Sequence, residues 1–202
     1  MKTIILTTIM LAGILIVGCE PKTTNVDVIN DQGGAVMQLD YRDFEQNASD
    51  MIQSMLKTGA LNKPGGGRYV VSVGRITDDT MQGGDLTTKI MSRIETDMLN
   101  SGKAVITAAV GSGKDEMLQE VRELRNSDEF NQDTTVEKHT LVAPELTITG
   151  KIIQSDITVN RSTQRAEYLF TLKLSDVKTG LTLWQDTKQI VKQGSSKSVP
   201  WN

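Results

Sequence analysis

Apolar side chains recur every three or four residues in three segments of the chain, which predicts three helices. We place them at residues 41–56, 86–101 and 115–125. Asp40 and Asp85 precede the first two runs as candidate N-caps, and Gly59 and Gly102 follow them as stops. The apolar stripes are Tyr41, Phe44, Ala48, Met51, Ile52, Met55 and Leu56; Leu86, Ile90, Ile94 and Met98; and Met117, Leu118, Val121 and Leu124.

Two shorter segments have the composition of buried strands. Residues 69–76 are rich in Tyr and Val, and residues 104–110 form a second mostly apolar run. The residues between the first strand and the second helix, Thr77 to Gly84, are predicted to form a loop. Residues 127–140 are polar, and their pattern predicts no regular element.

The last third of the chain alternates between apolar and polar residues, as strands with one buried face do. Leu146, Ile148 and Ile152 share one parity, whereas Ile153, Ile157 and Val159 share the other. This change predicts a bulge or twist near Gly150 to Ile153.

Two more strands follow. Residues 166–174 alternate, Lys178-Thr179-Gly180 is typical of a hairpin turn, and residues 181–191, which include Trp184, form the returning strand. The predicted order α-β-α-β-α-β-β-β implies an α/β fold, with one mixed sheet flanked by helices. We expect one domain over residues 40–194 and a short tail over 195–202.

The N-terminus carries a secretory signal that ends in a lipobox. Lys2 precedes an uncharged apolar run, and Ile16-Val17-Gly18-Cys19 places a small residue before a cysteine. The Cys19 thiol can accept a diacylglyceryl group, and a triacylated cysteine, with chains such as palmitate, is a permanent membrane tether. The alternative is a transmembrane anchor, but about 16 apolar residues are short for a bilayer span of about 20.

Cleavage before Cys19 removes the first 18 of the 202 residues and leaves 184, enough for one domain and a tail. Cys19 is the only cysteine, so no disulfide can stabilise the fold. Residues 19–39 are predicted to be the lipidated end and a polar, flexible tether interrupted by Pro21 and Gly33-Gly34. The mature chain has a net charge of −4 without a basic stripe, which argues against a nucleic-acid partner.

The residues that catalysis or metal binding would need are scarce. His139 is the only histidine, it has no nucleophile motif around it, and no zinc-ligand cluster is recognisable. We therefore predict no catalytic residue, no metal site and no cofactor. Asp78-Asp79 and Asp85 do not have the calcium-loop spacing and are expected to lie in a solvated loop.

A glycine-rich stretch between a predicted strand and a predicted helix invites comparison with a phosphate-binding loop. Gly111-Ser112-Gly113-Lys114 lacks two parts of that motif: Ala108 stands where it needs glycine, and Asp115 stands where it needs Ser or Thr. A flexible turn, with Asp115 starting the next helix, is the better interpretation.

Four stretches in this order, behind a lipobox, resemble the LpoB family of outer-membrane lipoproteins that activate penicillin-binding proteins. They lie within residues 41–193. The stretches are Tyr41-Arg42-Asp43 leading to Met51-Ile52-Gln53-Ser54-Met55-Leu56; Arg68-Tyr69-Val70-Val71-Ser72-Val73 with the later Leu99-Asn100-Ser101-Gly102-Lys103; Ala143-Pro144-Glu145-Leu146-Thr147-Ile148-Thr149-Gly150; and Lys178-Thr179-Gly180-Leu181-Thr182-Leu183-Trp184.

The resemblance implies a domain similar to the N-terminal domain of TolB and a regulatory role without catalysis. The expected partner is a class A penicillin-binding protein, and the expected state is a monomer anchored in the outer membrane and facing the periplasm. Glu20 after the cysteine favours export to the outer membrane. The tether departs from the best-known family members, which have a long Pro-rich one.

A structural subunit of an envelope assembly, either a CsgG-like secretion lipoprotein or a flagellum-associated one, is the alternative function. The partner-binding residues remain unknown. The predicted loops at residues 77–84 and 111–115 and the polar segment 127–140 are the regions where recognition is expected, because binding residues concentrate on loops held by a rigid scaffold.

Overall fold

A single five-stranded sheet organises the part of the chain that the structure, a computed structural model, describes: residues 36–83 and 85–198. The predicted signal peptide, Cys19 and most of the tether lie outside these residues. The strands are β1 (Tyr69–Asp79), β2 (Ala104–Ile106), β3 (Leu146–Asn160), β4 (Thr163–Asp176) and β5 (Thr182–Ser195). The helices are α1 (Tyr41–Lys57), α2 (Leu86–Asn100) and α3 (Glu116–Glu123), with short 3-10 turns at Leu124–Asn126, Gln132–Thr134 and Ser196–Ser198.

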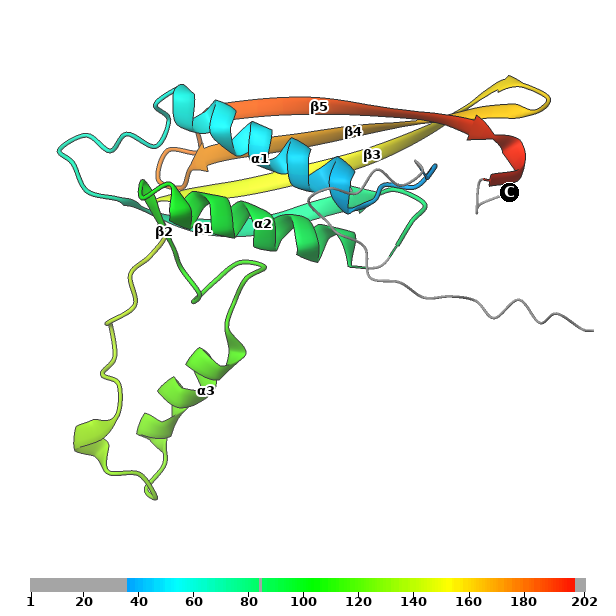
Figure 1. Cartoon of the computed structure of the whole chain (residues 1–202). Helices are drawn as coiled ribbons and strands as arrows, with labels where there is room; N and C mark the ends of the chain where they lie inside the picture. The colour runs from blue at the N-terminus through cyan, green and yellow to red at the C-terminus, as the bar shows by residue number, and fades with distance from the viewer. Residues whose placement is uncertain (1–35, 84, 199–202) are drawn as a thin grey trace, which may run out of the picture. The chain divides into compact units, whose positions relative to one another are not determined.

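The sheet is mixed, and its strand order is β2-β1-β3-β4-β5. β1 pairs in parallel with β2 and β3, whereas β3, β4 and β5 form an antiparallel meander. α1 and α2 cover one face of this sheet (Figure 1). The predicted α/β fold and the order of its elements are therefore confirmed.

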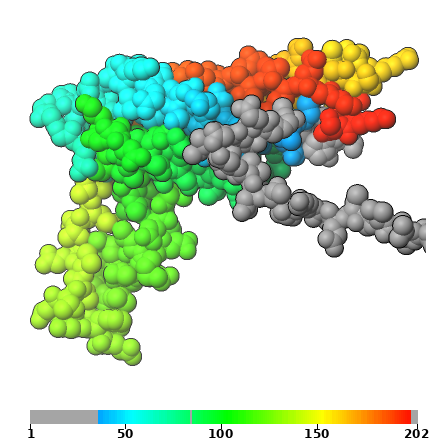
Figure 2. All heavy atoms as spheres, in the orientation of Figure 1, coloured from blue at the N-terminus to red at the C-terminus, as the bar shows by residue number. Residues whose placement is uncertain are grey.

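The hydrophobic core lies between this face of the sheet and the two long helices. In the space-filling view, α1 and α2 lie against each other over the sheet (Figure 2). The buried side chains from the helices are those that the helical spacing selected, and Trp184 of β5 joins them. They are Phe44, Ala48, Met51, Ile52 and Met55 of α1 and Leu86, Ile90, Ile94 and Met98 of α2.

The first turn of α1 is closed by a reciprocal cap. The Asp40 side chain accepts from the backbone N–H groups of Arg42 and Asp43, and the Asp43 carboxylate accepts from the Asp40 N–H at 2.8 Å. This arrangement satisfies donors that a helix start leaves unpaired, and it confirms the cap predicted at Asp40. Asp85 stands at the N-cap position of α2, but its side chain makes no capping hydrogen bond.

The ends of β1 and β2 differ from the predictions. β1 extends through Asp79, because residues 77–79 pair with residues 151–153 of β3, so the predicted loop loses its first three residues. β2 ends at Ile106, four residues before the predicted end. The chain stays beside β1 beyond that point, since the Ser112 N–H donates to the Val73 carbonyl at 3.0 Å, but it is no longer a regular strand.

Of the bulge or twist predicted near Gly150 to Ile153, the bulge is wrong. Residues 150–153 pair with β4 without a register shift, and the irregularity lies in β1 between Val73 and Ile76. Ile148 and Ile152 keep one parity and are buried, whereas Ile153 and Ile157 are exposed. The change of parity therefore marks apolar side chains on the face of the sheet opposite to the one that contains the core.

The β4–β5 turn follows the prediction from Lys178-Thr179-Gly180. Gly180 has a φ of 72°, and its N–H donates to the Asp176 carbonyl at 2.9 Å. The Asp176 carboxylate accepts from the backbone and the hydroxyl of Thr179, and these bonds hold the pKa of Asp176 below its usual range. β5 continues to Ser195, four residues past the predicted end of the strand.

We expect Ile94→Ala to destabilise the domain strongly. Ile94 is 1% exposed between α2 and the sheet, and replacing a buried Ile by Ala costs about 2–5 kcal/mol. Leu99→Ala is the matched control, because Leu99 is 49% exposed on the same helix and should cost much less. Urea denaturation measures both, and similar losses for the two variants would contradict this assignment of the core.

Candidate partner-binding site

Two of the three regions in which recognition was predicted belong to one segment. Residues 111–115 and 127–140 both lie between β2 and β3, on either side of α3. We call residues 107–144 the α3 segment. In the third region, residues 77–79 instead form the end of β1, and residues 80–83 follow it.

The α3 segment leaves the sheet and returns to it at β1. Near its start, the Thr107 N–H donates to the Val71 carbonyl at 3.0 Å, and the Ser72 hydroxyl donates to the Val110 carbonyl at 3.3 Å. Just after its end, the Glu145 N–H donates to the Val70 carbonyl at 2.8 Å. Both ends of the segment are therefore fixed to neighbouring residues of one central strand.

Glu145 secures the return point further. Its carboxylate accepts from Lys63 Nζ at 2.7 Å and from the Val70 N–H at 3.1 Å. These two bonds hold the pKa of Glu145 below its usual range. The stretch around Glu145, which contributed to the family resemblance, thus joins the start of β3 to β1 and to the loop after α1.

Polar bonds hold α3 in place within its segment. Asp115 caps the helix by accepting from the N–H groups of Met117 and Leu118. On the other side, Arg122 donates to the Glu137 carbonyl at 3.3 Å and to the Thr140 hydroxyl at 3.0 Å. These bonds connect the helix to the returning chain and do not involve the sheet.

The surface of the α3 segment is apolar and acidic. No residue of α3 is buried, and Met117 and Val121 are 61% and 43% exposed. Further exposed large apolar side chains in this segment are Val110, Phe130, Leu141 and Val142. The segment contains eight acidic and four basic residues, a net charge of −4 in a chain whose total is −3.

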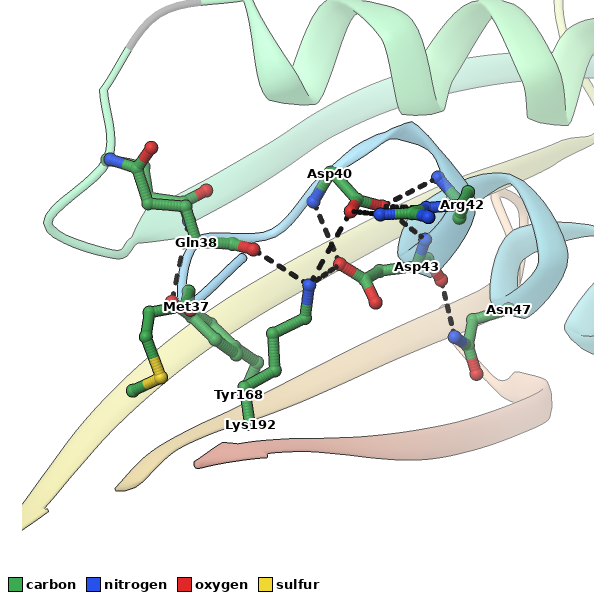
Figure 3. A network of polar contacts seen from close by, with 9 residues as sticks. Met37, Gln38, Asp40, Arg42, Asp43, Asn47, Tyr168 and Lys192 are labelled. Atoms are coloured by element: carbon green, nitrogen blue, oxygen red, sulfur yellow. Dashed lines mark hydrogen bonds and ion pairs between the residues drawn. The ribbon is translucent and has the colours of Figure 1, made fainter. Parts of the chain in front are cut away.

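A second polar site fixes the chain just before α1 to the far strands of the sheet (Figure 3). Lys192 of β5 pairs with the Asp43 carboxylate, lies 3.8 Å from Asp40 Oδ2, and donates to the Gln38 carbonyl at 2.8 Å. The Tyr168 hydroxyl of β4 donates to the Met37 carbonyl at 2.9 Å. We call Met37, Asp40, Asp43, Tyr168 and Lys192 the N-terminal latch.

Apolar contact supports the latch. Met37 is buried against Ala166 and Tyr168, in a small cluster separate from the main core. A Cβ atom at Gly194 would lie 2.9 Å from the Met37 sulfur, so glycine lets β5 and this segment approach closely. Met37, which lies inside the segment predicted to be tether, is therefore packed against the sheet.

The latch shifts the titration of two of its members. Burial raises the pKa of Asp40, but the hydrogen bond from Arg42, the charge of Lys192 and the Asp43 N–H outweigh it, and the net pKa is below the usual range. Burial, with the nearby charge of Asp156, raises the pKa of Tyr168 to about 12. At neutral pH the latch therefore combines an ionised Asp40 with a protonated Tyr168.

Residues considered for chemistry are scattered over the described structure. His139 is exposed, with a φ of 64°, in the α3 segment. Asp79 pairs with Lys151 at 2.6 Å, Asp78 accepts from the Thr80 N–H, and both lie in β1, not in the predicted loop. Within residues 36–83 and 85–198, no group of three His, Cys, Asp or Glu side chains could hold a metal ion.

The glycine-rich stretch has the geometry of the predicted turn. Gly111 has a φ of 91° beside β1, and the chain passes through Ser112 and Gly113 to the cap at Asp115. None of the helices in the described part of the chain has the length and hydrophobicity required for a membrane span.

We expect Lys192→Met to loosen the latch. The Lys192 side chain is 10% exposed. Its removal takes away the cation paired with Asp43 and leaves Asp40 with Arg42 alone, at a cost of about 1–3 kcal/mol. Urea denaturation measures this loss, and faster hydrogen exchange at the Asp40 amide locates it. Lys173→Met, at an exposed position of β4, is the control, and equal losses for the two variants would refute the role of Lys192.

The latch also predicts a pH dependence. Because the pKa of Asp40 is lower in the folded chain than its unfolded value of about 4, its stabilisation is fully present above that value and is lost as the pH falls through the folded pKa. The stability difference between wild type and Asp40→Asn should shrink between pH 6 and pH 3. Urea denaturation at several pH values measures it, and a constant difference would contradict this role.

The comparisons with known proteins agree with this domain. The family model for the peptidoglycan-synthase activator LpoB matches residues 43–190. The LpoB C-terminal domain from Salmonella enterica is similar, with 13% identity and a TM-score of 0.42, over 73% of this chain and 98% of that one. The NMR structure of Escherichia coli LpoB is 14% identical, with a TM-score of 0.40 and 96% of each chain covered.

The PelC dodecamer from Paraburkholderia phytofirmans is also similar, with 17% identity and a TM-score of 0.33, over 66% of this chain and 76% of that one. No curated protein sequence matches the chain. Since the family model spans the chain from the first turn of α1 into β5, this protein belongs to the LpoB family of peptidoglycan-synthase activators.

Proposed function

We propose that this protein is an outer-membrane lipoprotein, facing the periplasm, that binds a class A penicillin-binding protein and stimulates its peptidoglycan synthesis. The observation that carries the proposal is the LpoB family match over residues 43–190, which includes both long helices and almost the whole sheet. The lipobox at Ile16-Val17-Gly18-Cys19 supports the anchoring.

In this proposal Cys19 is the lipidated N-terminus of the mature chain. One acyl chain holds a protein only marginally, whereas two or more hold it stably, at about 0.8 kcal/mol for each buried CH2 group. Glu20, the residue after the cysteine, supports export to the outer membrane.

The latch limits how far the domain can move from its anchor. Because Met37 is buried against the sheet, only residues 20–36 stand between this contact and Cys19 in the sequence. A chain of this length spans at most about 60 Å when fully extended. A synthase bound by this domain must therefore present its docking surface within the reach of this connection plus the length of the domain itself.

The proposed activator works by binding alone. A binding partner shifts the balance between inactive and active states of the synthase only by the difference in its affinity for the two states. A tenfold shift requires about 1.4 kcal/mol of such preference. The relation is reciprocal, so ligands that favour the active state would also tighten binding of the lipoprotein.

A pull-down from detergent-solubilised envelopes, followed by a synthesis assay, tests the proposal. Residues 20–202 without lipid serve as bait, and we expect recovery of a class A penicillin-binding protein whose synthesis rate rises when purified bait is added. Heat-denatured bait is the control for nonspecific capture and for effects of added protein on the assay.

Two results would contradict this function. One is recovery of the chain itself in a ring-sized complex, or of secretion or flagellar components, which would support an envelope-assembly subunit. The other is recovery of the synthase with an unchanged synthesis rate, which would indicate binding without activation.

A further inference from the structure

We propose that one face of α3, the apolar residues Met117 and Val121 beside the acidic residues Glu116, Glu120 and Glu123, docks on a basic surface of the synthase with an apolar centre. This inference rests on the proposed function and assigns the partner contact to a particular element.

α3 contributes nothing to the hydrophobic core. None of its residues is buried, and the core is formed by α1, α2 and the sheet. The helix is nevertheless held, by the Asp115 cap and by Arg122, which reaches the returning chain. Because polar bonds already fix this helix, its exposed Met and Val side chains are held in place without a bound partner.

The exposed side chains of α3 form two adjacent rows. Met117 and Val121 are four residues apart and therefore lie on the same side of the helix. Glu116, Glu120 and Glu123 are four and three residues apart, so they also lie on one side of the helix. Because Glu116 and Glu120 each precede a residue of the apolar row, the acidic row lies beside it. Protein interfaces combine a small apolar centre with a polar rim, and these two rows offer both within a single helix.

The negative charge of this face indicates which kind of molecule binds to it. The α3 segment has a net charge of −4, while the rest of the chain sums to +1. A second copy would bring two such segments together, and residues 20–34 of the tether are acidic as well, with three acidic residues and one basic. Like charges disfavour both occupants, and they disfavour an anionic membrane surface too. A partner protein with a basic surface has the charge that complements the acidic residues of this face.

The open face of the sheet offers a comparison. Ile153 and Leu169 are paired across β3 and β4 and are exposed, and Val191 of β5 is exposed nearby. Their charged neighbours, Arg165 and Glu167, have opposite signs and lie 3.9 Å apart. This patch has no net charge that would select a partner, so it serves as the control surface.

Binding of the full-length lipoprotein in detergent to the purified class A synthase tests the inference, by biolayer interferometry. Met117→Ala with Val121→Ala should weaken binding about tenfold or more, because such truncations at an interface centre are costly. Leu169→Ala with Val191→Ala is the matched control and should bind like wild type. Since alanine favours helix and α3 has no buried residue, thermal unfolding of the α3 variant should match wild type.

A second pair of variants separates docking of α3 from general attraction. Glu116→Gln with Glu120→Gln removes two charges from the α3 face, and Asp128→Asn with Glu129→Gln removes two from elsewhere in the same segment. The first pair should weaken binding and flatten its salt dependence more than the second. Equal effects of the two pairs would mean that only the total charge of the segment matters, which overturns the proposed face.

The remaining outcomes are distinct. If wild type binds and the Met117/Val121 variant binds equally well, the docking face is refuted while the proposed function stands. If wild type does not bind the synthase at all, the proposed function fails first. If the Met117/Val121 variant instead abolishes self-association in analytical ultracentrifugation, the face is an interface between copies and the inference is wrong.

Discussion

Apolar contact between two helices and one face of the sheet is the interaction on which the rest of the structure depends. Of the buried apolar residues in the described part of the chain, all but Met37, Ala166 and Tyr168 belong to this single cluster. α1 and α2 supply its helical side, and all five strands of the sheet supply the other. The latch adds a smaller cluster beside this core, and α3 contributes no buried residue to it.

The sequence predicted this core well because its signal is local. The positions of Ile90, Ile94 and Met98 follow from helical spacing alone, and the cap at Asp40 follows from the residue type before an apolar run. The predicted hairpin turn at Gly180 has the same basis, since its positive φ favours glycine. These three predictions needed only neighbouring residues, and all three were confirmed.

Predictions that depended on distant residues were less successful. The parity change at Ile153 indicated a bulge, but it reflects a second apolar face, and no local pattern distinguishes the two. The latch was missed because Met37 and Lys192 are 155 positions apart, and a lone methionine in a polar stretch predicts no contact. The only available signal was the pair Met37 and Leu39, apolar residues next to the Asp40 cap.

For the candidate partner surface, too, the sequence predicted one part of the structure correctly and another wrongly. The sequence placed recognition at residues 111–115 and 127–140, and the structure places both in one segment around α3. The apolar stripe of α3 had predicted a helix with a buried side, whereas Met117 and Val121 are exposed. The same periodicity indicates an apolar helix face whether that face is buried by this chain or by a partner protein. Only the fold could show that this chain leaves it exposed.

This arrangement assigns stability, anchoring and recognition to different parts of one domain. The latch lies at the end of α1 from which the chain leads to the proposed anchor, and it fixes that connection to β4 and β5. The α3 segment is fixed to β1, close to Val71 and Val73, which are buried in the core. The proposed anchor and the proposed partner contact are therefore connected to different strands of the one sheet, the first to β4 and β5 and the second to β1.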